Sequence, residues 1–168
     1  MLVVSDRIAA GTHEDESGRE ACRVLTGWGG DVVHYETVPD DPDPIRERIL
    51  HYADQDRLDL VVTSGGTGFA DRDVTPEATR GLLVKEAPGL AELMRRETAR
   101  FTAFAALSRG VCGIRGKTLI LNLPGSPKGV VQCLEVLRPL IPHAVRVLRG
   151  EPEGHPSTRP VSPMEDGA

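Results

Sequence analysis

Apolar and polar residues alternate along the first part of the chain in blocks that predict strands separated by helices. Apolar runs at residues 2–4, 32–38 and 58–63 are typical of strands, and the last has no polar alternation. A strand that is apolar throughout suits a sheet covered on both faces. Because each strand is followed by a helical segment, we expect a largely parallel sheet with right-handed crossovers.

Spacing and capping residues predict the helices between these strands. Ser17 to Glu20 has capping-box spacing, Ala21, Leu25 and Trp28 follow at helical intervals, and Gly29-Gly30 ends the helix. Asp43-Pro44 predicts the N-cap and first position of a second helix, with Ile45, Ile49 and Tyr52 on its buried face.

The second half predicts further helices and a pair of strands. Thr75-Pro76 begins a helix that stops before Pro88, and a long helix follows at 89–100 with Leu90, Leu93 and Met94 inward. Strands are expected at 111–114 and 118–123, joined by a turn at 115–117, before a mainly helical stretch at 127–149 interrupted near Pro139 and Pro142. Residues 1–150 therefore form one domain, and the Pro-, Gly- and Ser-rich tail 151–168 is expected to be disordered.

Composition excludes several classes of protein. The 168 residues are 39% hydrophobic and 27% charged, with a formal charge of −5 and no stripe of Lys or Arg, so we expect no nucleic-acid partner. No apolar run is long enough to cross a bilayer, and no basic segment precedes residues 2–4, so we expect neither membrane insertion nor a secretory signal. The opening run is short for a first strand, and we expect a few residues to be missing upstream.

Cys22, Cys112 and Cys133 fit no zinc or disulfide pattern and are expected to be buried thiols of a cytoplasmic protein.

Polar and glycine-rich loops follow the ends of four predicted strands. They are Asp6, the pair Asp40-Asp41, the segment 64–68 and the segment 122–128. Ligands of open parallel sheets bind beyond the carboxyl ends of the strands. We therefore expect these loops to share one site.

The segment Ser64-Gly65-Gly66-Thr67-Gly68 is the first candidate anion-binding loop. Its glycines permit positive φ and leave the main-chain N–H groups accessible, and successive N–H groups form a concavity that binds anions. It is neither a Walker loop nor a dinucleotide fingerprint. The alternative is a tight turn in which the glycines serve geometry alone.

Asp73 lies five residues beyond this loop. A carboxylate beside a phosphate pocket is repulsive unless a divalent ion lies between them, and Mg²⁺ commonly uses one or two carboxylates together with phosphate oxygens. The alternative is that Asp73 caps the following helix, although Thr75 is better placed to do so.

Two other segments carry candidate residues. The loop at 122–128 precedes a helix, so its backbone donors and Lys128 could hold an anion, although Pro-Gly and Ser-Pro are also common turn dipeptides. The pair Ser108-Arg109 ends an apolar stretch and either reaches a substrate or satisfies a helix end.

These motifs, in this order, resemble the molybdopterin adenylyltransferases, the MogA-like branch of the MogA/MoaB family. The matching segments are Ser5-Asp6-Arg7, Asp15-x-Ser17-Gly18, Val38-Pro39-Asp40, Thr63 to Gly68, Arg72 to Glu77 and Asn122 to Lys128. The resemblance covers roughly residues 2–149. The Leu-Pro-Gly-Ser-Pro-Lys loop favours the adenylyltransferase branch over MoaB-like relatives.

The resemblance implies a three-layer α/β domain, usually a homotrimer, that transfers AMP from ATP to the terminal phosphate of molybdopterin with Mg²⁺ present. It also implies a possible hand-over of product to the molybdenum insertion protein. Asp40 and Asp73 match the catalytic carboxylates and are the candidates for holding Mg²⁺. The candidate substrate-binding residues are Asp6, Ser64, Gly65, Gly66, Thr67, Gly68, Thr75, Glu77, Ser108, Pro124, Gly125, Ser126, Pro127 and Lys128.

Three alternatives stay open at this point. A MoaB-like protein could bind the pterin as a carrier or scaffold without turnover. A paralogue could act on another nucleotide or pterin, and a nucleotide hydrolase on a similar domain would consume ATP without any pterin.

Overall fold

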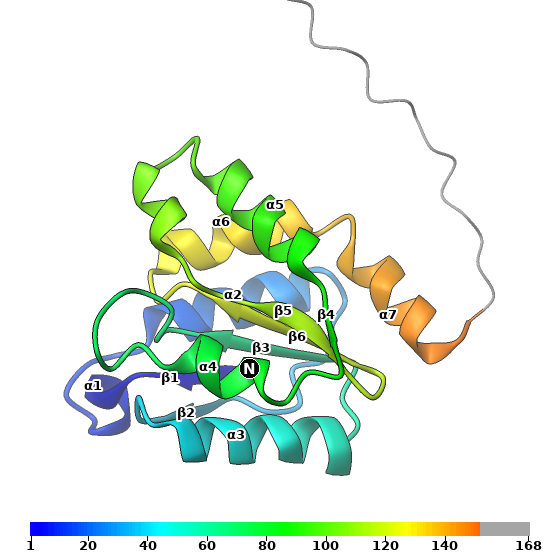
Figure 1. The fold of residues 1–168 in the computed structure, drawn as a ribbon, viewed down its shortest axis with the longest axis horizontal. Helices are drawn as coiled ribbons and strands as arrows, with labels where there is room; N and C mark the ends of the chain where they lie inside the picture. Colours follow the sequence, from blue (N-terminus) through cyan, green and yellow to red (C-terminus); the bar gives the residue numbers. More distant parts are fainter. Residues whose placement is uncertain (152–168) are drawn as a thin grey trace, which may run out of the picture.

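Six strands form one sheet within residues 1–151, which are the residues that this computed structural model describes (Figure 1). The strands are β1 (Leu2–Val4), β2 (Glu36–Val38), β3 (Leu60–Ser64), β4 (Lys85–Glu86), β5 (Cys112–Arg115) and β6 (Thr118–Leu123). They lie in the order β2-β1-β3-β6-β5-β4. β2, β1, β3 and β6 pair in parallel, whereas β5 is antiparallel to both β6 and β4. The expected mostly parallel sheet is confirmed.

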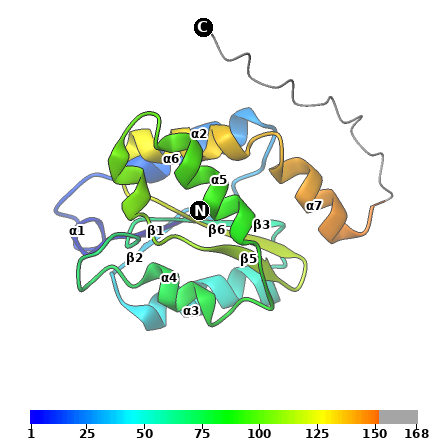
Figure 2. The same ribbon diagram turned by 45° about the horizontal axis from the view of Figure 1, so that its top comes forward.

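Helices cover both faces of this sheet and make a three-layer α/β structure (Figure 2). One face carries α2 (Glu16–Gly27), α5 (Pro88–Thr98), α6 (Pro127–Leu137) and α7 (Ile141–Arg149), and the other carries α3 (Pro42–Leu50) and α4 (Thr75–Arg80). The short elements are α1 (Asp6–Ala9), the π-helical turn η1 (His51–Gln55) and the 3₁₀ helix η2 (Ala103–Leu107).

The central strands divide the hydrophobic core into two clusters. In β6, Leu119, Leu121 and Leu123 pack with α2, α5 and α6, while Ile120 faces the cluster that contains α3 and α4. These four side chains are almost completely buried. Burial on both faces explains why the strand is apolar at every position from 119 to 121 and needs no polar alternation.

Several predicted boundaries differ from the structure. The strand expected at 32–38 is only Glu36–Val38, because just three residues pair with β1. The N-caps of α2 and α3 are Asp15 and Asp41, two residues before the expected positions, since their carboxylates reach the first free N–H groups. Helix α4 ends at Arg80, and β4, which was not predicted, pairs with β5 before α5 begins.

The cysteine prediction is correct for two of the three residues. Cys112 and Cys133 are buried, and burial raises the pKa of each thiol to about 12, whereas Cys22 is half-buried. All three are free thiols. The predicted disorder of the tail concerns residues 152–168, which lie outside the described residues.

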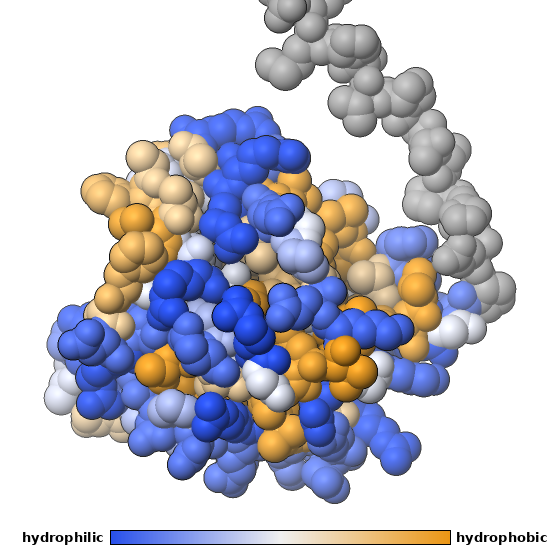
Figure 3. All heavy atoms as spheres, in the orientation of Figure 1, coloured by the Kyte–Doolittle hydropathy of each residue, from blue (hydrophilic) through white to orange (hydrophobic). Residues whose placement is uncertain are grey.

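Exposed apolar side chains gather on and beside η2. Phe101 and Phe104 are 65% and 78% exposed, and Leu107 is also exposed. Figure 3 shows this apolar area at the upper left, over η2. None of the helices within residues 1–151 is long and apolar enough to span a membrane.

Candidate active site

The two glycine-rich loops meet at the carboxyl ends of β3 and β6. The Ser64 hydroxyl donates a hydrogen bond to the carbonyl of Pro124 at 3.0 Å, and the Gly65 N–H donates to the carbonyl of Leu123 at 3.2 Å. A Cβ atom on Gly125 would lie 3.4 Å from the Cα of Gly65. The loops therefore touch through backbone, which confirms their predicted proximity.

The conformation of the first loop requires glycine at two consecutive positions. Gly65 has φ +101° and Gly66 has φ +63°, which is the left-handed region. A Cβ atom at Gly65 would lie 2.2 Å from the carbonyl oxygen of Val4, and one at Gly66 would lie 2.3 Å from the Thr75 hydroxyl. The tight-turn interpretation of these glycines is thus correct in geometry, and anion binding by the same turn stays a prediction.

Thr75 stabilises this turn through hydrogen bonds to its carbonyls and is not a helix cap. Its hydroxyl donates to the carbonyl of Gly65 at 2.9 Å, and its N–H donates to the carbonyl of Gly66 at 3.1 Å. The N-cap position of α4 is Val74, which makes no side-chain cap. The expectation that Thr75 caps α4 is therefore wrong, because its hydroxyl is engaged by the loop.

Asp73 lies beside the glycine turn, as the sequence predicted. One of its carboxylate oxygens accepts a hydrogen bond from the Ala70 N–H at 2.8 Å, and the Asp73 N–H donates to the carbonyl of Ala70 at 2.8 Å. A Cβ atom on Gly68 would lie 2.8 Å from the same carboxylate oxygen. Asp73 therefore closes a turn of its own and does not cap α4.

Asp6, Asp40 and Arg72 form a second polar cluster at the ends of β1 and β2. The Asp6 N–H donates to the Asp40 carboxylate at 2.8 Å, and the Asp40 N–H donates back to the Asp6 carboxylate at 3.1 Å. The Arg72 guanidinium pairs with Asp6 at 2.7 Å. Desolvation raises the pKa of Asp40. The hydrogen bond from the Asp6 backbone lowers this pKa, whereas the negative charges of Asp6 and Asp73 raise it further.

Two cavities adjoin these clusters. The first, called the apolar cavity, has a volume of about 400 Å³ and includes Met94, Phe104 and Leu107 in its wall. The second, called the polar cavity, has a volume of about 600 Å³ and includes Asp6 and Asp40. Three residues line both: Gly66, Asp73 and Gly125. Asp73 therefore lies at the boundary between the two cavities.

Most of the predicted site residues line one of these cavities. The polar cavity contains Asp6, Asp40, Ser64, Gly65 and Pro127, and the apolar cavity contains Thr67, Gly68, Ser108, Pro124 and Ser126. Thr75, Glu77 and Lys128 line neither. Thr75 is fully buried beneath the turn, Glu77 pairs with Arg109, and Lys128 lines a neighbouring surface hollow with Arg19 and Arg23.

The carboxylates suit a magnesium ion only if the substrate supplies further ligands. No group of three or more His, Cys, Asp or Glu side chains within residues 1–151 could hold a metal ion by itself. Asp40 and Asp73 nevertheless both line the polar cavity. Mg²⁺ is commonly bound in this way, by one or two carboxylates plus phosphate oxygens.

Three arginines of the site region make contacts that the sequence did not predict, although Arg109 was named there, with Ser108, as reaching a substrate or satisfying a helix end. Arg72 bridges the Asp6 cluster, Arg95 donates to the carbonyls of Ser108 and Gly110, and Arg109 contacts the glycine loop. Most of their acceptors are backbone carbonyls or residues far away in the sequence. Such contacts leave no local pattern, although Arg72 and Arg109 both adjoin residues that the motifs had singled out.

Comparison with known proteins identifies the family. The model of the probable molybdopterin binding domain matches residues 1–143. A molybdopterin adenylyltransferase of Helicobacter pylori is 44% identical over 89% of this chain and 86% of its own length. The structure of the molybdopterin biosynthesis enzyme MoaB from Thermus thermophilus is 52% identical, with a TM-score of 0.85 over 90% of this chain and 95% of that one. A MogA structure is 42% identical, with a TM-score of 0.82 over 88% of this chain and 96% of that one. The chain therefore belongs to the molybdopterin-binding domain family of molybdenum cofactor biosynthesis.

Proposed function

We propose that this protein is a molybdopterin adenylyltransferase, which transfers AMP from ATP to the terminal phosphate of molybdopterin and releases pyrophosphate. The observation that carries the proposal is the position of Asp73 in the wall shared by the two cavities. A transfer reaction needs two ligands whose reacting atoms meet. The curated relatives with this name cover nearly the whole domain, which supports the same activity.

The chemistry requires positioning and charge neutralisation more than a strong base. A phosphate monoester is largely dianionic at neutral pH, because its second pKa is about 6. Its oxygen attacks the α-phosphorus of ATP, a new P–O bond forms, and the bond between the α-phosphorus and the oxygen that bridges to the β-phosphorus breaks. The electron pair leaves with pyrophosphate. Gly66 lines both cavities, and its backbone N–H would donate to the phosphates at this junction.

Asp40 and Asp73 would hold Mg²⁺ together with the phosphates. When bound, the ion supplies positive charge that offsets repulsion between the phosphates and these carboxylates. The protein's own part is to keep the two side chains fixed: Asp40 through the Asp6 N–H, and Asp73 through the Ala70 N–H.

The residues that line the two cavities suggest how the substrates divide. The polar cavity combines the Gly65-Gly66 turn with the carboxylates of Asp40 and Asp73, so it would hold a polyphosphate together with Mg²⁺. The apolar cavity, with Met94, Phe104 and Leu107, suits a planar ring system. The two phosphates that react would then meet at Asp73.

A second candidate function is favoured by one comparison. The Thermus thermophilus MoaB structure is more similar in sequence, at 52% identity, than the MogA structure at 42%. A MoaB-like protein that binds the pterin as a carrier or scaffold would use the same cavities without turnover.

One assay separates these candidates. The purified protein is mixed with molybdopterin, ATP and Mg²⁺, pyrophosphate release is followed, and the product is identified by mass spectrometry. Adenylyl-molybdopterin formed in step with pyrophosphate supports the transferase. Pterin binding without pyrophosphate supports the carrier, and ATP consumption without pterin would indicate a nucleotide hydrolase.

The cellular setting belongs to the same proposal: a cytoplasmic homotrimer that requires Mg²⁺ and passes its product to a molybdenum insertion protein. The exposed apolar residues Phe101, Phe104 and Leu107 support assembly, because a cluster of this kind commonly marks a contact surface. Sedimentation velocity measures the number of subunits directly.

A further inference from the structure

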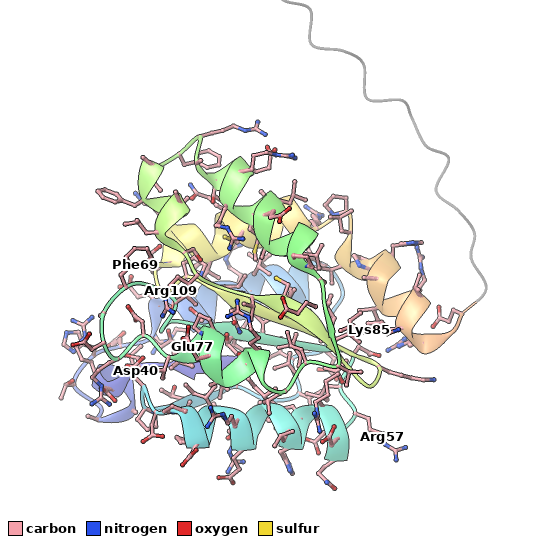
Figure 4. All side chains as sticks on the ribbon, in the orientation of Figure 1. Asp40, Arg57, Phe69, Glu77, Lys85 and Arg109 are labelled. Carbon is pink, nitrogen blue, oxygen red and sulfur yellow. The ribbon has the colours of Figure 1, made fainter. Side chains whose placement is uncertain are left out.

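Arg109 donates hydrogen bonds to four residues at and around Asp73. Its N–H donates to the carbonyl of Thr67 at 2.9 Å, and its guanidinium Nε donates to the carbonyl of Gly68 at 2.7 Å. The two terminal guanidinium nitrogens donate to the Asp73 carbonyl and to the Glu77 carboxylate. Figure 4 shows Arg109 and Glu77 side by side at the end of the molecule that also carries Asp40.

The segment that these contacts hold has little packing of its own. Residues 69–72 are exposed, so no buried side chain fixes the loop between Gly68 and Asp73. Within it, the two hydrogen bonds between Ala70 and Asp73 close a turn, and the exposed Arg72 side chain ties the middle of the loop to Asp6 at the end of β1. Arg109 attaches both ends, one at the Gly68 carbonyl and one at the Asp73 carbonyl.

The guanidinium lies outside the two cavities. Arg109 lines neither the apolar nor the polar cavity, and its side chain is 34% exposed beside Glu77. Its carboxylate partner comes from the first turn of α4. A planar guanidinium can bond several acceptors at once in fixed directions, which an ammonium group does not do.

We propose that Arg109 is the positioning residue of this site, and that Glu77 orients its guanidinium. By holding Gly68 and Asp73 at fixed separation, Arg109 keeps the Asp73 carboxylate at the boundary between the cavities. The effect on catalysis rests on the proposed adenylyl transfer, whereas the effect on the loop does not.

Amide hydrogen exchange tests the loop without any activity. We expect the amides of Ala70, Asp73 and Thr75, which are hydrogen-bonded in this structure, to exchange at least about tenfold faster in Arg109→Ala, since one charge-assisted bond is worth roughly a factor of ten. Arg109→Lys keeps the charge and is expected to restore little of the protection. The matched control is Arg80→Ala, which removes an exposed arginine of α4, the helix that carries Glu77; its ion-pair partner is Glu86 of β4.

Steady-state kinetics tests the consequence for the reaction. Arg109→Ala should lower kcat about 30-fold or more while the KM for each substrate stays within about threefold, because only the placement of Asp73 changes. Millimolar methylguanidinium should restore part of kcat to Arg109→Ala and none to Asp73→Asn. A role in general stability alone would show neither the split between kcat and KM nor the rescue.

Three results would overturn the proposal. Unchanged exchange at Ala70 and Asp73 in Arg109→Ala would show that the guanidinium does not hold the loop. Faster exchange with unchanged kcat would show that the loop does not matter for transfer, and equal effects in Arg80→Ala would show that the response is not specific. A parent protein that releases no pyrophosphate would refute the proposed function, and the exchange measurement would still decide the role of Arg109.

Discussion

Replacing Asp73 by Asn removes a single negative charge from the wall between the two cavities and leaves its shape in place. An asparagine side chain has the size of aspartate, and its oxygen can still accept the hydrogen bond that the Ala70 N–H now gives at 2.8 Å. The turn between Ala70 and Asp73 should therefore persist. Because the backbone bond between the same two residues is also kept, we expect the free energy of unfolding to change by no more than about 1 kcal/mol.

The loss in turnover should be much larger than the loss in stability. Asp73 is one of the two carboxylates proposed to hold Mg²⁺, and it is the one of the two that lines both cavities. Removing one electrostatic element that acts at the transition state typically lowers kcat by about 100- to 1,000-fold, or about 2.7–4 kcal/mol. Pterin binding should persist, because the Asn side chain fills the same space in the cavity wall.

The assay compares pyrophosphate release, pterin affinity and urea unfolding in Asp73→Asn with those in Asp71→Asn. Asp71 lies in the same exposed loop but lines neither cavity, so it loses the same charge without touching the junction. The reasoning is refuted if Asp73→Asn turns over within about threefold of the parent, or if Asp71→Asn loses as much.

Three further predictions concern the support of the site. Gly65→Ala should destabilise the fold by about 3 kcal/mol or more in urea unfolding, because its Cβ would lie 2.2 Å from the Val4 carbonyl oxygen; a stable variant would show that the turn can relax. The pKa of Asp40, measured from its carboxyl ¹³C shift, should lie above the ordinary aspartate value and fall in Asp73→Asn, since a neighbouring negative charge is lost; an unchanged pKa would contradict this coupling. Asn122→Ala should cost about 2–4 kcal/mol, because its buried amide donates to two buried threonine hydroxyls at 3.0 Å; a loss below about 1 kcal/mol would mean that these groups find other partners.

The fold was predictable where hydrophobic pattern alone decides it. The apolar run Leu119-Ile120-Leu121 was recognised as part of a strand, and the structure shows that it is buried on both faces of the sheet. Helix starts were less predictable: Asp15 and Asp41 were missed as caps because Ser17 and Asp43 have equally suitable side chains. Only backbone geometry, which periodicity does not encode, selects between residues two positions apart.

The site residues were predictable where consecutive glycines or a nearby carboxylate form a pattern that is uncommon elsewhere in the chain. Gly65, Gly66 and Asp73 stood out by composition and spacing, and the structure brings them together. Arg109 was noticed beside Ser108, but its contacts could not be predicted, because its acceptors include the carbonyls of Gly68 and Asp73, and every residue has a carbonyl. Bonds from side chain to main chain over 36 to 41 positions leave no trace in composition or local order.

The candidate active site is held together by contacts between residues far apart in the sequence, so activity should be a sensitive measure of the intact fold. Asp6 and Arg72 are 66 positions apart, and Ser64 and Pro124 are 60 apart. A fragment that ends before β6 would lack one of the two touching loops, and a fragment that starts after β1 would lack the Asp6 anchor. Heat inactivation should consequently follow the cooperative loss of the whole sheet, with no partially active species on the way.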